Sequence, residues 1–147
     1  MKRRILLVDD DLAVRLTLKA VLELHGFEVE MAASTAEALT RLHSATYHMV
    51  ISDLHMETEN AGLEVIRAAR NQSYAPATAL LTAYPPEDVS RKDGLGENHA
   101  DSLLVKPLGT DALIRQIEVL LIRHADRQQR QERNSVSDTL PPRRTAS

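Results

Sequence analysis

Carboxylate, hydroxyl and ammonium side chains stand at the ends of four short apolar runs in this sequence. In chain order these residues are Asp9, Asp10, Asp53, Thr82 and Lys106. Converging carboxylates raise one another's pKa unless a cation lies between them, and such hard oxygen ligands suit Mg²⁺. A carboxylate beside Mg²⁺ and a lysine is a competent nucleophile toward phosphorus, because both cations neutralise charge on the transferring group. The residues therefore indicate aspartyl phosphate chemistry.

Five apolar runs alternate with helical patterns, and this order would bring those residues together. The runs, each predicted to be a strand, cover residues 4–8, 28–32, 49–52, 77–81 and 102–105. Such short runs are typical of strands buried on both faces of a parallel sheet. We predict an α/β protein of the (βα)5 type, with a doubly wound five-stranded parallel sheet. Ligands of such sheets bind outside the carboxyl ends of the strands, where the candidate residues fall.

The helical spacing of apolar residues predicts four clear helices and one weak helix. The clear helices are expected over residues 12–25, from the Ser34–Glu37 capping box onward, over 62–71 and over 110–124. Asp11 is expected to be the N-cap of the first helix. The weak helix, around residues 86–98, is interrupted by two glycines.

Composition predicts one globular unit followed by a polar tail. The chain has 147 residues, 43% of them hydrophobic, and no cysteine, which excludes disulfides and thiolate metal sites. Residues 126–147 carry five arginines against three acidic residues, a net charge of +2. Because the whole chain has a net charge of −3, residues 1–125 have a net charge of −5. Because the tail has few large apolar residues, we predict a domain over 1–125 and a disordered polar, basic tail over 126–147. The sequence contains no signal peptide pattern or spanning apolar stretch, so a cytoplasmic location is expected.

The combination of Asp9 and Asp10, Asp53, Thr82-Ala83 and Lys106-Pro107 resembles the receiver domain of two-component response regulators. The resemblance covers about residues 3–124. It implies a CheY-like, flavodoxin-like fold and a stand-alone phosphorelay switch rather than an enzyme, although such a switch catalyses its own phosphorylation and dephosphorylation. It also implies that Asp53 is the phosphoacceptor and becomes an aspartyl phosphate.

The resemblance assigns a role to each remaining site residue. Mg²⁺ would be held by Asp10, Asp53 and the backbone carbonyl of His55, with Asp9 acting through water. Thr82 would be the switch hydroxyl and Lys106 the phosphoryl-binding lysine. The Lys106–Pro107 peptide bond is expected to be cis.

The resemblance also implies partners. A sensor histidine kinase or phosphotransfer protein would supply the phosphoryl group. The signal would leave through the face of the fourth helix, fifth strand and fifth helix, toward a downstream protein that the sequence does not identify. We expect a monomer or a weak dimer through that face, with no direct DNA binding and no membrane contact.

Three departures from the family pattern concern the site. Glu57 replaces a proline in a loop about one residue longer than usual, and Glu57 and Glu59 would either strengthen cation binding or repel a phosphodonor. Leu103 stands where the family commonly has an aromatic switch residue that moves inward on phosphorylation. His55 and Tyr84 occupy the two positions that tune dephosphorylation in the family.

Two other classes of function compete with the phosphoacceptor switch. One is a receiver fold that acts as a phosphorylation-independent interaction module. The other is a phosphatase or nucleotide-binding protein on a similar scaffold. A haloacid-dehalogenase-type phosphatase would need an acid at position 55, which is His55, and the sequence contains no phosphate-binding G-x-x-x-x-G-K-[ST] loop.

Overall fold

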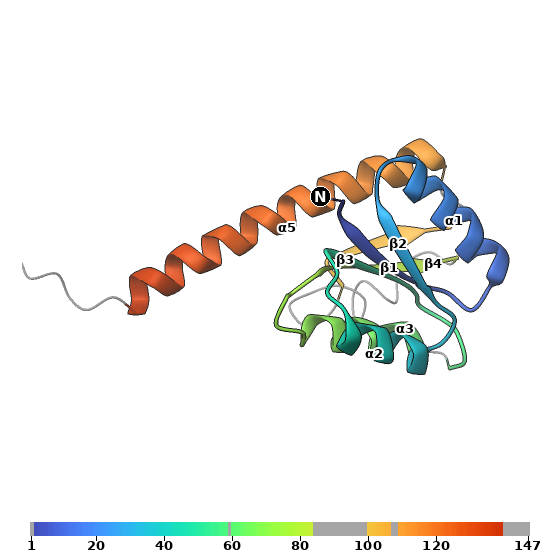
Figure 1. Cartoon of the computed structure of the whole chain (residues 1–147), viewed down its shortest axis with the longest axis horizontal. Coiled ribbons are helices and arrows are strands. Elements are labelled where there is room, and N and C mark those ends of the chain that lie inside the picture. Colours follow the sequence, from blue (N-terminus) through green and yellow to red (C-terminus); the bar gives the residue numbers. More distant parts are fainter. Residues whose placement is uncertain (1, 59, 84–99, 107–108, 140–147) are drawn as a thin grey trace, which may run out of the picture.

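The computed structural model of the chain describes residues 2–58, 60–83, 100–106 and 109–139 (Figure 1). Within them, five parallel strands form one sheet in the order β2-β1-β3-β4-β5. The strands are β1 (Arg4–Val8), β2 (Glu28–Ala32), β3 (Met49–Asp53), β4 (Ala77–Thr82) and β5 (Ser102–Val105). The predicted doubly wound α/β fold is confirmed, and each strand lies within one residue of its predicted limits.

Helices cover both faces of this sheet. They are α1 (Leu12–Leu24), α2 (Thr35–Ser44), α3 (Ala61–Arg70) and α5 (Thr110–Thr139). In Figure 1, α1 and α5 lie on one face, and α2 and α3 lie on the other. The alternation of side chains along β1 explains this sandwich, because Ile5 and Leu7 belong to the core under α1 and α5. Leu6 and Val8 belong to the core under α2 and α3.

The predicted helix starts are present as hydrogen bonds. Asp11 caps α1, since its Oδ1 accepts from the backbone N of Ala13 at 2.9 Å and of Val14 at 3.3 Å. Ser34 caps α2, since its Oγ accepts from the backbone N of Glu37 at 3.2 Å. Both caps satisfy N–H groups that have no partner within the helix.

The C-terminal helix differs from its prediction. It does not end at residue 124 but continues to Thr139, and it projects beyond the sheet (Figure 1). The structure therefore has a helix over residues 126–139, where the sequence predicted a disordered tail. Arginine, glutamine, glutamate and alanine make up most of residues 123–133, and these are strong helix formers that need no buried face to favour a helix. That residues 1–125 form a self-contained domain stays a prediction.

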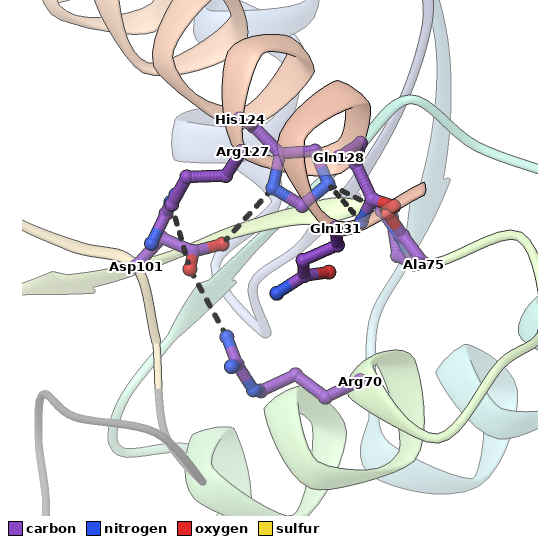
Figure 2. Close-up of a pocket in the computed structure, with 8 residues that line it drawn as sticks. Arg70, Ala75, Asp101, His124, Arg127, Gln128 and Gln131 are labelled. Carbon is purple, nitrogen blue, oxygen red and sulfur yellow. Dashed lines mark hydrogen bonds and ion pairs between the residues drawn. The ribbon is translucent and has the colours of Figure 1, made fainter. Parts of the chain in front are cut away.

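A buried carboxylate at the amino edge of the sheet ties α5 to the core. Asp101, just before β5, accepts from the backbone N of Thr78 at 2.8 Å. The same carboxylate pairs with Arg70 of α3 at 3.1 Å and with Arg127 of α5 at 3.3 Å (Figure 2). His124 Nδ1 lies 3.9 Å from it. We call these five residues the Asp101 cluster.

Several expectations lie outside the described residues. They are the fourth helix around 86–98, Glu59, Tyr84, the Lys106–Pro107 bond and the tail beyond 139. Among the helices that are described, none combines the length and the apolar character needed to cross a bilayer.

Candidate functional site

Three carboxylates from two neighbouring strands meet at the carboxyl edge of the sheet. Asp9 and Asp10 follow β1, Asp53 ends β3, and these strands are hydrogen-bonded to each other. One carboxylate oxygen from each residue lies within 4.8 Å of those from the other two. Asp9 is completely buried and Asp53 nearly so, whereas Asp10 is exposed. The predicted convergence of these carboxylates is confirmed.

Lys106 reaches into the same group from the end of β5. Its Nζ lies 3.2 Å from Asp9 Oδ2 and 3.6 Å from Asp53 Oδ1. Its backbone N donates to the carbonyl of Thr82 at 2.6 Å, which fixes the start of the lysine side chain at the end of β4. We call Asp9, Asp10, Asp53 and Lys106 the acidic site. It contains three carboxylates and one ammonium group.

The charge balance of the acidic site is reflected in Asp53. Burial, together with the charges of Asp9 and Asp10, raises the pKa of Asp53 from 3.8 to about 6, although Lys106 acts in the opposite direction. One lysine therefore does not compensate the negative charge gathered here. Carboxylate oxygens that are close together and partly open to solvent are the ligands that Mg²⁺ takes in proteins, so this donor set fits Mg²⁺.

Backbone contacts fix the position of Asp9. Its Oδ1 accepts from the backbone N of Asp11 at 2.9 Å. Its carbonyl accepts from Arg15 of α1 at 2.6 Å, and its N–H donates to the carbonyl of Ala32 at 3.1 Å. The carboxylate is thereby held with its Oδ2 toward Lys106.

The two predicted switch residues lie on adjacent strands. Thr82 is buried at the end of β4, where it pairs with Val105 of β5, and Ala83 after it is exposed. Leu103, in the middle of β5, is half-buried and packs against an apolar cluster that includes Leu54. Leucine here already contacts the interior at a position where the family commonly has an aromatic residue.

Gly62 holds α3 close to Asp53. A Cβ at this position would lie 2.2 Å from the Asp53 carbonyl oxygen and 2.6 Å from Leu54 Cα, so no other residue fits without movement of the backbone. Its N–H donates to the Leu54 carbonyl at 2.9 Å. The sequence signal was the glycine that follows the acceptor aspartate in the family pattern.

Glu57 points to α2. Its Oε1 accepts from the backbone N of Thr35 at 2.8 Å, and this hydrogen bond lowers the pKa of Glu57. The two effects expected from the sequence, stronger cation binding or repulsion of a phosphodonor, stay predictions. His55 lies between Asp53 and Glu57 and is half-buried.

Comparison with known proteins identifies the family. The response regulator receiver domain matches residues 5–118. The transcriptional regulatory protein CpxR homolog of Haemophilus influenzae is 40% identical over 122 residues, which are 83% of this chain and 52% of that protein. The response regulator MprA of Mycolicibacterium vanbaalenii is 36% identical over 84% of this chain and 52% of its own. The chain therefore belongs to the response regulator receiver family, and it spans about half the length of these curated relatives.

Solved structures agree with this assignment. The chemotaxis response regulator CheY4 of Vibrio cholerae is 30% identical, with a TM-score of 0.72 over 82% of this chain and 99% of that one. The response regulator TrrA of Thermotoga maritima, in complex with Mg²⁺-BeF, is 35% identical, with a TM-score of 0.68 and the same coverage. Receiver domains are signalling switches rather than enzymes in the ordinary sense, and the acidic triad Asp9, Asp10 and Asp53 is typical of their Mg²⁺ site.

Proposed function

We propose that this chain is a phosphoacceptor receiver of a two-component phosphorelay, in which Asp53 accepts a phosphoryl group in the presence of Mg²⁺. The observation that supports this most is the acidic site itself. A single lysine contacts both Asp9 and Asp53, at 3.2 and 3.6 Å, within a group of three carboxylates. Such an excess of negative charge favours a bound cation, which Mg²⁺ would supply, and the same cation would neutralise charge on an incoming phosphoryl group.

Asp10, Asp53 and the backbone carbonyl of His55 would hold the metal, with Asp9 acting through water. When bound, Mg²⁺ would neutralise charge on the phosphoryl oxygens. It would also favour the ionised form of Asp53, which is the nucleophilic form. The related TrrA structure contains Mg²⁺-BeF, which supports this assignment.

In the transfer step, a carboxylate oxygen of Asp53 forms a bond to phosphorus. The bond between phosphorus and an imidazole nitrogen of the donor histidine breaks, and the nitrogen keeps the electron pair. The Lys106 ammonium and the Thr82 hydroxyl would donate hydrogen bonds to the phosphoryl oxygens. Thr82 would report the modification to β5 and Leu103.

The phosphoryl donor would be a sensor histidine kinase or a phosphotransfer protein in the cytoplasm, and the output would be contact with a downstream protein. The CpxR homolog is a transcriptional regulatory protein, and this chain covers 52% of it. Transcriptional regulation by that relative is therefore not part of this proposal.

Intact mass after incubation with acetyl phosphate tests the proposal. The wild type should gain one phosphate in Mg²⁺ and none in EDTA, and Asp53→Asn should gain none in either. Asp126→Asn is the matched control, because Asp126 is an exposed aspartate on α5 far along the chain from the acidic site. It should behave as the wild type.

Label that survives in Asp53→Asn would overturn the assignment of the acceptor. Mg²⁺ binding without any adduct would instead favour the phosphorylation-independent interaction module. The packing of Leu103 against buried Leu54 and Leu80 would then explain the lack of a switch, because the residue expected to move inward on phosphorylation is already packed inside.

A further inference from the structure

The loop that follows Asp53 is connected to α2 by one side chain. Glu57 Oε1 accepts a hydrogen bond of 2.8 Å from the backbone N of Thr35, which is 22 residues earlier in the sequence. Ser34 is the N-cap of α2, so Thr35 is the first residue of the helix. Glu57 is therefore a cap for α2 that comes from a different segment of the chain.

This cap meets a specific need of α2. The first N–H groups of a helix have no partner within it, and a negative charge at this end interacts favourably with the helix dipole. Ser34 Oγ accepts from the backbone N of Glu37, which leaves the N–H of Thr35 for another acceptor. Glu57 provides a charged acceptor, and charge-assisted hydrogen bonds are stronger than neutral ones.

The same bond limits how residues 54–58 can move. At one end of this segment, the N–H of Gly62 donates to the Leu54 carbonyl at 2.9 Å, and α3 contacts the end of β3 there. In the middle, Met56 packs against the core between the sheet, α2 and α3. Glu57 adds a third attachment directly after Met56, and His55 lies between these points.

We propose that Glu57 is a positioning residue, whose hydrogen bond to Thr35 holds the β3–α3 loop so that the His55 carbonyl is in place for Mg²⁺. This inference rests on the proposed function, in which that carbonyl is a metal ligand. Residues that orient metal ligands without touching the metal typically change affinity by 10- to 100-fold when they are lost. Glu57 would act through its geometry as an acceptor and not through attraction of the cation.

Two substitutions at position 57 separate geometry from charge. Glu57→Gln keeps an oxygen acceptor and removes the charge, whereas Glu57→Ala removes both. Positioning predicts that Glu57→Gln binds Mg²⁺ within about twofold of the wild type, and that Glu57→Ala binds about tenfold more weakly. Equal losses of affinity in both variants, with hydrogen exchange of residues 54–58 unchanged, would overturn the proposal in favour of charge attraction. Glu64→Ala, which removes an exposed carboxylate from the first turn of α3, is the control and should match the wild type.

A substitution of the donor tests the bond from the other side. Thr35→Pro removes the N–H that Glu57 accepts from, together with the buried threonine hydroxyl, at the first helical position, where proline fits a helix well. The preceding residue, Ser34, is extended with φ −154° and ψ 167°, as a residue before proline requires. Thr35→Ala keeps the N–H and is the matched control. Thr35→Pro should weaken Mg²⁺ binding as much as Glu57→Ala does. The variant that combines both substitutions should bind Mg²⁺ as strongly as either single variant, because both remove the same hydrogen bond.

Calorimetric titration with MgCl₂ measures these affinities, and hydrogen-exchange mass spectrometry of residues 54–58 measures the loop without metal. Faster exchange in Glu57→Ala and Thr35→Pro, but not in Glu57→Gln, is the expected pattern. Wild-type affinity and exchange in both of these variants would overturn the proposal while leaving the proposed function intact. Absence of Mg²⁺ binding in the wild type would instead contradict the proposed function, and with it the assignment of Glu57 to metal binding.

Discussion

The two edges of the sheet each contain a buried aspartate, but in opposite electrostatic surroundings. At the carboxyl edge, Asp53 shares the acidic site with two further carboxylates and one lysine. At the amino edge, Asp101 lies among Arg70, Arg127 and His124 (Figure 2). It also accepts from the N–H and the hydroxyl of Thr78. The negative charge of Asp53 is therefore only partly compensated by a cation, whereas the carboxylate of Asp101 has hydrogen-bond and ion-pair partners on both oxygens.

This difference separates a functional carboxylate from a structural one. A buried carboxylate surrounded by donors stabilises the fold, and its removal leaves those donors unsatisfied. A buried carboxylate among like charges costs stability, and the protein gains from a cation or from the loss of that charge. Neutralising Asp101 and neutralising Asp53 should consequently have opposite effects on folding.

Gly62→Ala should have the largest effect, because it places a Cβ against the backbone of Asp53 and Leu54, which no rotation of a side chain can relieve. We expect the free energy of unfolding to fall by about 3–4 kcal/mol in urea denaturation. Gly109→Ala is the control, since a Cβ there would meet no atom within 4 Å. Equal stability of the two variants would contradict the close approach of α3 to β3.

Asp101→Asn should lower the free energy of unfolding by about 2–3 kcal/mol, because it removes the negative charge that pairs with Arg70 and Arg127. Its single carbonyl oxygen can accept from Thr78 or from the arginines but not from both, so the NH₂ group faces donors on the other side. Thermal and urea unfolding both measure this loss. An unchanged midpoint would show that the Asp101 cluster contributes nothing to stability.

Asp53→Asn should raise the free energy of unfolding by about 1–2 kcal/mol at pH 8 in EDTA. The pKa of Asp53 is about 6 in the folded chain against 3.8 ordinarily, so the folded state binds more protons between these values. The stability of the wild type should fall as pH rises from 4 to 6 and then level off, and the variant should lack this slope. Saturating Mg²⁺ should stabilise the wild type and leave Asp53→Asn unchanged. A destabilised Asp53→Asn variant in EDTA would contradict the comparison.

Arg127→Ala should have the smallest effect, a loss of about 0.5 kcal/mol or less, because this side chain is 52% exposed and its ion pair is screened by solvent. Arg70→Ala, whose side chain is 28% exposed, should cost more. Urea unfolding at low and high salt measures both losses of stability. A larger loss for Arg127→Ala than for Arg70→Ala would show that the main partner of Asp101 lies on α5.

The features that sequence reasoning found are local ones. Asp9 and Asp53 directly follow strands that are readable as short apolar runs, and parallel strands end at a common edge, so their meeting could be predicted. Asp11 and Ser34 are caps whose partners lie two or three residues away. In each case the interaction is defined by a spacing within one element or by the topology of the sheet.

The features that were missed depend on contacts between distant segments. Glu57 meets Thr35, and Asp101 meets Arg70 and Arg127, through pairs that no periodicity indicates. The continuation of α5 was missed for a different reason. The prediction weighed how little residues 126–139 could bury, whereas the intrinsic helix propensity of residues 123–133 and the attachment of Arg127 to Asp101 act in the opposite direction.

If α5 tilts at Arg127, the part of the helix beyond that residue moves as a lever arm. At 1.5 Å per residue, residues 128–139 extend about 18 Å from Arg127. A tilt of about 10° at Arg127 would displace the tip by about 3 Å, by the geometry of a rigid rod of this length. Asp101 and Lys106 flank the same short strand, β5, so the base of the lever and the acidic site are two ends of one rigid element. A tilt of α5 that moves its base only slightly would thus displace Thr139 enough to change a contact with another molecule.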